Sequence, residues 1–141
     1  MRLWHYKLIP VLPKSQLLAQ WREINSILKK QDKHILINYV YNYDKEYLRT
    51  YAWDVVNEML RRGIKVETMD NMANYFGKVT FDKCDTTLRF SEHNTRYLRQ
   101  NYYNLQEKFD RGQKDLDEVQ FFAIFNACAK EIARHGTEVD E

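Results

Sequence analysis

The stretch SQLLAQWREINSILKK, residues 15–30, decides the fold. Its large apolar residues Leu17, Trp21, Ile24 and Leu28 recur at spacings of 4, 3 and 4. This is the period of one face of an α-helix, because about 3.6 residues complete a turn. The spacing therefore predicts an amphipathic helix that buries one apolar stripe.

The polar residues of this helix are not needed for its core. On a helical wheel, Glu23 falls opposite the apolar stripe and Arg22 falls on its flank. Ser15 is a candidate N-cap, and Pro13 just before it hinders extension of the helix upstream. Arg22 and Glu23 are therefore available to solvent or to a ligand.

Three further helices are expected. Asp44 is positioned to cap the second, which ends at Arg61-Arg62-Gly63, cations followed by a glycine. The third is expected to begin at Ser91. The fourth is expected to run from Asp115 or Asp117 to Gly136. Its inward-facing residues are expected to be Phe121, Phe122, Phe125, Cys128 and Ile132.

The connecting segments show little helical period. Residues 35–43 are expected to form an irregular, partly buried connector, and residues 64–90 a long loop with one short helical turn near Asn71–Phe76. The acidic tail, residues 137–141, is expected to fray. The chain has only four glycines and two prolines, which favours helices over a turn-rich β fold. We expect a mostly α, single compact domain over residues 1–141, with about four helices and an extended N-terminal segment near the first helix.

Composition excludes several classes of protein. With 44% hydrophobic and 30% charged residues, the 141-residue chain is typical of a globular protein rather than a disordered one. No apolar run approaches the roughly 18 residues of a membrane span, and Pro10, Pro13 and Lys14 interrupt any signal-peptide core. We expect a cytoplasmic protein in which Cys84 and Cys128 are reduced thiols, the latter buried in a helix.

Charge is unevenly distributed along the chain. Residues 1–63 contain 11 lysines and arginines against 6 acidic residues, whereas residues 64–141 contain 11 against 14. The first half therefore has the sign of a nucleic-acid-binding surface. Ordinary variation along a globular chain explains the same difference equally well.

The sequence motifs of several enzyme classes are absent. The four histidines are scattered, and neither cysteine has a partner at zinc spacing. No HExxH, P-loop or GxGxxG sequence is present. We therefore expect no metal and no cofactor.

The N-terminus offers a different chemistry. It begins Met1-Arg2-Leu3-Trp4-His5, a basic and aromatic run shortly ahead of Arg22-Glu23. An α-amine has a pKa of about 7.7–8, so a useful fraction is neutral at pH 7 and can act as a nucleophile. A nearby carboxylate can stabilise the positive charge that develops when the amine attacks a sugar.

Several motifs together carry a resemblance to a known family. They are Met1-Arg2-Leu3-Trp4-His5, Leu8-Ile9-Pro10, Leu12-Pro13, Leu17-Leu18, Arg22-Glu23, Lys33-His34, Asn38-Tyr39-Val40, Glu58-Met59-Leu60-Arg61-Arg62-Gly63 and Glu92-His93-Asn94. In these the chain resembles the pyrimidine-dimer DNA glycosylases of the phage endonuclease V type, and above all the short bacterial members. The similarity is specific over residues 1–63 and looser to about residue 100.

The resemblance implies a bifunctional DNA glycosylase and abasic-site lyase. The N-terminal amine, here on Met1, attacks C1′ of the damaged nucleotide, the base leaves, and a Schiff base permits β-elimination. Glu23 protonates or positions the sugar. The partner is damaged double-stranded DNA, with a base flipped from the stack, and the protein is expected to be a monomer. The expected catalytic residues are Met1, Arg2 and Glu23. Positive or polar residues near this site are expected to hold the DNA: Gln16, Arg22, Lys29, Lys30, Lys33 and His34.

Two positions depart from the phage pattern. Arg2 stands where the phage enzyme exposes a small residue after methionine removal, and Gln16 stands where it has a histidine. Either the N-terminal strand shifts register, or Met1 is removed despite Arg2, or the lyase chemistry is lost. The lesion need not be a pyrimidine dimer. Two alternatives to the enzyme are a non-catalytic DNA-binding module of the same fold and a helical protein-interaction domain.

Overall fold

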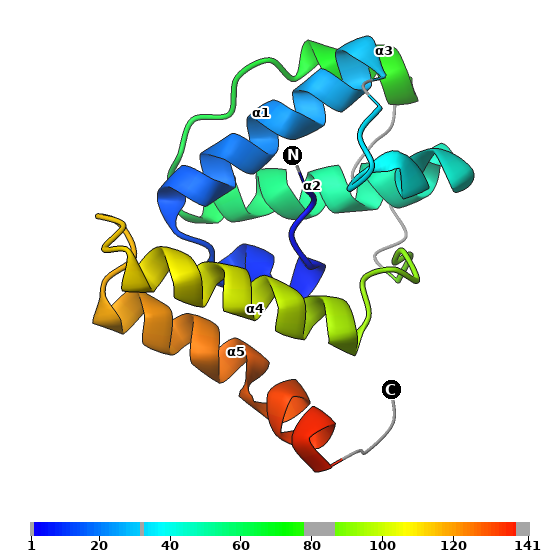
Figure 1. Cartoon of the computed structure of the whole chain (residues 1–141). Coiled ribbons are helices and arrows are strands. Elements are labelled where there is room, and N and C mark those ends of the chain that lie inside the picture. The colour runs from blue at the N-terminus through cyan, green and yellow to red at the C-terminus, as the bar shows by residue number, and fades with distance from the viewer. Residues whose placement is uncertain (1, 32, 78–86, 138–141) are drawn as a thin grey trace. The chain divides into compact units, whose positions relative to one another are not determined.

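The computed structural model describes residues 2–31, 33–77 and 87–137, with backbone alone for 132–137. These residues contain helices and no strand, which confirms the mostly α fold (Figure 1). There are two 3-10 helices, η1 (Tyr6–Val11) and η2 (Asn38–Asn42). The α-helices are α1 (Lys14–Lys30), α2 (Lys45–Arg61), α3 (Asp70–Phe76), α4 (Thr95–Asp110) and α5 (Glu118–Thr137).

The chain divides into two compact units. Unit 1 contains Met1–Leu3 and Leu17–Phe90, and unit 2 contains Trp4–Gln16 and Ser91–Glu141. Each unit has its own buried apolar residues. That the two units form one domain stays a prediction.

The core of unit 1 is built on the stripe expected from the sequence. Leu17, Trp21, Ile24 and Leu28 are all buried on α1. The Trp21 indole N–H donates to the Glu67 carbonyl at 2.9 Å, which fixes the segment between α2 and α3 against α1. A buried indole that also finds a hydrogen-bond acceptor anchors a core strongly, because neither its apolar nor its polar part is left uncompensated.

Helix α2 begins and ends as its sequence predicts. Asp44 is its N-cap residue, although its side chain makes no capping hydrogen bond. At the other end, Gly63 takes the left-handed conformation, with φ of 74°. The Glu58 carboxylate is buried in the last turn and forms ion pairs with Arg61 and, at 2.7 Å, with Arg62. Both arginines therefore neutralise a buried charge, in addition to interacting favourably with the helix dipole at the C-terminal end of α2.

Unit 2 packs η1, α4 and α5 together. Helices α4 and α5 lie side by side (Figure 1). The Lys7 ammonium forms an ion pair with Glu131 at 2.9 Å, joining η1 to α5. Burial raises the pKa of the Cys128 thiol to about 12, so the thiol stays protonated and unreactive at neutral pH.

The N-terminal half of the chain differs from expectation at two points. Helix α1 already begins at Lys14, so Ser15 is not its N-cap; the Ser15 N–H instead donates to the Asp115 carboxylate at 2.8 Å. The N-terminal segment is not extended throughout, because η1 forms within it. The His5 ring accepts a hydrogen bond from the Lys7 N–H at 3.1 Å and so caps η1.

The C-terminal half needs three corrections. Asn94 rather than Ser91 caps α4, through the Tyr97 N–H. Asp117 accepts from the Gln120 N–H as expected for a cap, but α5 ends at Thr137, one residue beyond Gly136. Two phenylalanines expected in the core are exposed. They are Phe122 (62%) and Phe125 (42%).

The reason for the exposed phenylalanines is the rotation of α5. Ile124 and Cys128, one turn apart, are fully buried and set the inward face. Phe122 and Phe125 then fall outside that face. The sequence alone presented a nearly continuous apolar run here, which does not fix the inward direction of a helix. The predicted placements of Cys84 and of the Ile132 side chain lie outside the described residues.

The connectors agree more closely with the sequence. Residues 35–43 are irregular apart from η2, and the short turn expected near Asn71–Phe76 is α3. The part of the predicted loop over residues 78–86 lies outside the described residues.

Trp21→Ala should lower the free energy of unfolding by about 3–5 kcal/mol, because it leaves a cavity in the core of unit 1 and removes the indole hydrogen bond to the Glu67 carbonyl. Urea titration followed by circular dichroism measures this. Leu60→Ala is the control: Leu60 is an exposed apolar residue of the same unit, and its loss should change stability by less than about 0.5 kcal/mol. Equal effects of the two changes would contradict the role of Trp21.

Candidate active site

Glu23 lies at the centre of a polar network in unit 1. It is half-buried on α1, and one turn before it Gln20 is completely buried. The Gln20 side-chain nitrogen donates to a Glu23 carboxylate oxygen at 3.0 Å and to the Arg2 carbonyl at 2.9 Å. The amide therefore holds the carboxylate and the N-terminal backbone together.

The other end of the Gln20 side chain is also bonded. Its carbonyl oxygen accepts a hydrogen bond from the Tyr51 hydroxyl of α2 at 2.8 Å. Both side-chain N–H groups and the oxygen thus have partners, as a buried amide requires. This saturation fixes the orientation of the amide and, through it, the positions of Arg2 and Glu23.

The pKa of Glu23 is raised above its ordinary value, and burial is the largest cause. Several effects oppose the rise: the charge of the amino terminus, a hydrogen bond from the Arg2 backbone N–H, and the charges of Arg22 and Arg2. The group therefore keeps its proton to higher pH than a solvated glutamate while remaining surrounded by positive charge. A carboxyl group in this state is suited to proton transfer beside an anionic ligand.

The candidate nucleophile is described only in part. Met1 lies outside the described residues. Arg2 is described, and its backbone is fixed on both sides: the N–H points to Glu23 and the carbonyl accepts from Gln20. The Arg2 backbone is thus held beside the Glu23 carboxylate.

The positive residues expected at DNA lie along the same helix. Arg22 is exposed, and Lys29 and Lys30 are exposed in the last turn of α1. Seven residues make nearly two turns, so Lys29 and Lys30 follow Arg22 and Glu23 on the same side of α1, about 10 Å further along. One side of the helix therefore presents a carboxyl group flanked by cations.

The remaining predicted DNA contacts differ in their surroundings. Lys33 and His34 are exposed beyond α1. The His34 ring accepts the Leu36 N–H at 3.2 Å, so it has a structural role. Gln16 belongs to unit 2, where its side-chain oxygen accepts from Gln113 at 2.7 Å.

Sequence reasoning did not identify Gln20 or Tyr51. A signal existed for Gln20, because it lies three residues after Leu17 and four before Ile24, within the buried side of the helix. A polar residue in such a position needs a specific partner. Tyr51 is 31 positions away in sequence, and no local pattern connects it to Gln20.

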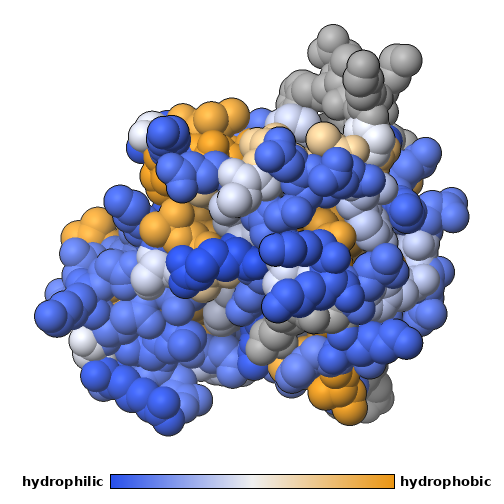
Figure 2. Space-filling model, turned by 90° about the horizontal axis from the view of Figure 1, so that it is seen from above, coloured by the Kyte–Doolittle hydropathy of each residue, from blue (hydrophilic) through white to orange (hydrophobic). Residues whose placement is uncertain are grey.

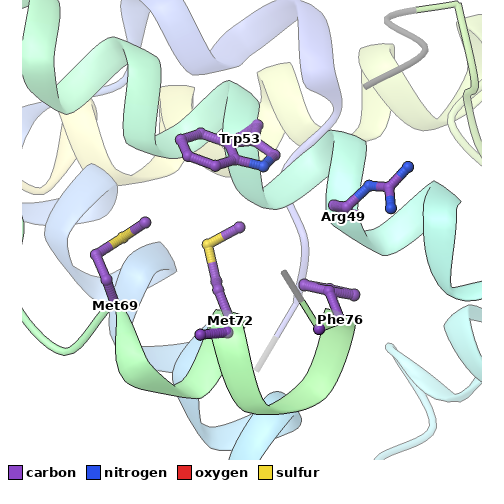
Figure 3. Close-up of a pocket in the computed structure, with 7 residues that line it drawn as sticks. Arg49, Trp53, Met69, Met72 and Phe76 are labelled. Atoms are coloured by element: carbon purple, nitrogen blue, oxygen red, sulfur yellow. The ribbon is translucent and has the colours of Figure 1, made fainter. Parts of the chain in front are cut away.

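Unit 1 also contains an apolar cavity of about 250 Å³ between α2 and α3. Figure 3 shows Met69, Met72 and Phe76 on one side facing Trp53 of α2, with Arg49 at the edge. The Arg49 Nε is buried without a hydrogen-bond partner. Neither Gln20 nor Glu23 lines this cavity.

The model of one protein family matches this chain. It is the pyrimidine dimer DNA glycosylase model, and it matches residues 1–72, about half of the chain. The chain belongs to the pyrimidine dimer DNA glycosylase family. The matched residues include the whole Gln20–Glu23 network and the cations of α1. None of the curated proteins and none of the solved structures is a match for the chain.

Family membership makes the chain a DNA repair glycosylase, an enzyme whose substrate is DNA. Within the part of the chain that the structure describes, no helix is long and apolar enough to cross a membrane. In the same residues, no group of three or more histidine, cysteine, aspartate or glutamate side chains could hold a metal ion.

Gln20→Met should lower stability by about 1–3 kcal/mol, because it removes the hydrogen bonds that the buried Gln20 amide makes with the Tyr51 hydroxyl and the Arg2 carbonyl. It should also raise the pKa of Glu23 further, since a hydrogen bond to the carboxylate is lost. NMR titration of the Glu23 side chain measures the second effect. Tyr51→Phe, the matched control, should weaken the fold but move the Glu23 pKa much less.

Proposed function

We propose that this glycosylase is also an abasic-site lyase, and that its nucleophile is its own N-terminal α-amine. The observation that carries the proposal is the attachment of the Arg2 backbone to Glu23 and Gln20. This attachment holds the second residue of the chain beside Glu23, the half-buried carboxyl group among the cations of α1. Such a juxtaposition of amine and acid is what the reaction requires.

The reaction needs no cofactor in this proposal. The neutral amine attacks C1′ of the damaged nucleotide, the glycosidic bond breaks, and the base leaves with a proton. The sugar ring opens as the C1′ iminium forms. Loss of a proton from C2′ then expels the 3′ phosphate by β-elimination, and water releases the amine from the product.

Glu23 serves two steps of this sequence. In its protonated form it can protonate the sugar oxygen as the ring opens, which the raised pKa favours. Once ionised, it stabilises the positive iminium. Arg22 and Arg2 offset the repulsion between this carboxylate and the DNA phosphates.

The amine can belong to either of two residues. With Met1 retained, the nucleophile is the Met1 amine, one residue beyond the nitrogen that contacts Glu23. If Met1 is removed, the Arg2 nitrogen itself becomes the free amine, and its hydrogen bond to Glu23 puts it in place. The mass of the N-terminal peptide cross-linked to DNA decides between them.

We propose further that the cations of α1 hold the phosphates. Arg22, Lys29 and Lys30 share one exposed side of the helix, and Lys33 and His34 extend this set. Gln16, which belongs to unit 2, is proposed as a further DNA contact. A helix side with several cations and a single acidic group fits a polyanion.

Borohydride reduction in the presence of abasic-site DNA should yield a covalent protein–DNA adduct, because borohydride reduces a Schiff base to a stable amine. One extra glycine before Met1 should reduce the adduct at least about tenfold by displacing the amine from Glu23. Gel electrophoresis measures the adduct. Its absence in the native chain, with DNA binding intact, would favour the non-catalytic DNA-binding module.

Glu23→Gln should lower the rate of strand cleavage by about 100-fold or more, because it removes the acid. Duplex affinity should stay unchanged or rise, since a negative charge leaves the DNA surface. Single-turnover cleavage and gel shifts at two salt concentrations measure these effects. A variant that cleaves at the native rate would contradict the role of Glu23.

Glu23→Gln should also change how the stability of the protein depends on pH. The folded-state pKa of Glu23 is raised, so its contribution to stability is fully present below the unfolded pKa and is lost as pH rises through the folded value. The Gln side chain of the Glu23→Gln variant does not ionise, so the variant avoids this loss of stability at higher pH. The variant should therefore be at least as stable as the native chain near pH 7, and this advantage should shrink towards pH 4, as measured by urea titration at both values.

A further inference from the structure

The turn that follows α1 exposes two large apolar side chains. Ile35 is 86% exposed and Leu36 is 45% exposed; together they are called the apolar tip. Figure 2 shows one face of the molecule, where apolar side chains form small patches among hydrophilic ones. Exposed isoleucine and leucine side by side are unfavourable in water, so a partner that covers them would gain free energy.

Hydrogen bonds hold the apolar tip in one conformation. The His34 N–H donates to the Asn38 side chain at 2.8 Å, and the Leu36 N–H donates to the His34 ring at 3.2 Å. The Ile37 N–H donates to the His34 carbonyl at 2.8 Å, while the Ile37 side chain is fully buried below. The tip is therefore presented on an anchored turn, and little conformational entropy is lost when a partner covers it.

The surroundings of the tip are positive. Over residues 29–36 the sequence has three lysines against one acidic residue, Asp32. Lys29, Lys30 and Lys33 are all exposed. An apolar projection among cations matches a ligand with an anionic rim and an apolar interior, which describes a nucleic-acid duplex opened between two base pairs.

The position along α1 relates the tip to Glu23. Lys30 follows Glu23 by nearly two turns on the same side, or about 10 Å, which corresponds to roughly three base steps of about 3.4 Å each. A duplex laid along this side with a sugar at Glu23 would extend past the end of the helix. Its bases would then come within reach of the turn that carries the tip.

We propose that Ile35 and Leu36 form a wedge that enters the base stack of the duplex a few base steps away from the lesion, while Lys29, Lys30 and Lys33 hold the phosphates in between. This inference rests on the proposed function and adds to it the residues that deform the DNA. Burial of the two apolar side chains between bases offsets part of the free-energy cost of unstacking one base step. Two side chains are too few for a stable protein interface, which needs about 1,000 Å².

The test uses duplexes with an uncleavable tetrahydrofuran abasic site and 2-aminopurine about three or more base steps from it, the spacing that separates Glu23 from the end of α1. The native chain should increase the 2-aminopurine fluorescence, because an unstacked base is no longer quenched. Ile35→Asn combined with Leu36→Asn should abolish most of this increase and weaken duplex binding about tenfold or more. Val119→Asn is the matched control, since Val119 of α5 is 80% exposed, and it should behave as the native chain.

Salt dependence separates the wedge from the phosphate contacts. The Ile35/Leu36 double variant should keep the native slope of log K against log salt, whereas Lys30→Gln should reduce its magnitude by about 0.9. Native fluorescence and affinity in the double variant, or an equal loss in Val119→Asn, would overturn the wedge. Circular dichroism of each variant verifies folding.

A second substrate distinguishes the wedge from the lyase chemistry. Borohydride trapping on a single-stranded abasic oligonucleotide requires no unstacking of a duplex, so the double variant should form as much adduct as the native chain. Equal losses on single and double strands would show that the tip supports the active site, and would overturn the wedge. A further outcome is that the native chain unstacks 2-aminopurine but forms no adduct, and that the double variant loses the unstacking. This result would uphold the wedge and reject the lyase.

Discussion

The hydrogen bonds of the Gln20 side chain are the constraint on which the candidate active site depends. A primary amide that is fully buried must satisfy its two N–H groups and its oxygen within the protein. Here it does so with Arg2, Glu23 and Tyr51. One side chain thereby positions the start of the chain, the candidate acid of α1 and the middle of α2. Moving any one of the three would break a hydrogen bond of this buried amide.

The same network places the Glu23 carboxyl group where burial and positive charge have opposite effects on its pKa. Burial raises the pKa of Glu23, while Arg2, Arg22 and the amino terminus act in the opposite direction. The carboxyl group can therefore exchange a proton in a strongly positive setting. A fully solvated glutamate at the same position would be ionised and repelled by phosphates, and a fully buried one without cations would not ionise.

Helix α1 combines several tasks because a helix has distinct sides. Its apolar side, from Leu17 to Leu28, builds the core of unit 1. Its other side carries the exposed Arg22, Lys29 and Lys30 and the half-buried Glu23. Gln20 lies on the buried side, and its hydrogen bond to Glu23 connects the two sides. The residues that match the family model, 1–72, include all of α1. The family match therefore covers the helix that contributes to both the core and the candidate site.

The sequence by itself determined the features that depend on neighbours within a helical turn. The stripe of α1, the stop of α2 at Gly63 and the adjacency of Arg22 and Glu23 follow from local spacing. Tertiary structure decided which face of α5 is buried, and so exposed Phe122 and Phe125. It also decided that Asp115 binds the Ser15 N–H and that Tyr51 completes the bonding of Gln20. These outcomes depend on residues distant in the chain, because a buried face or a buried polar group is defined by the packing partner that the fold brings to it.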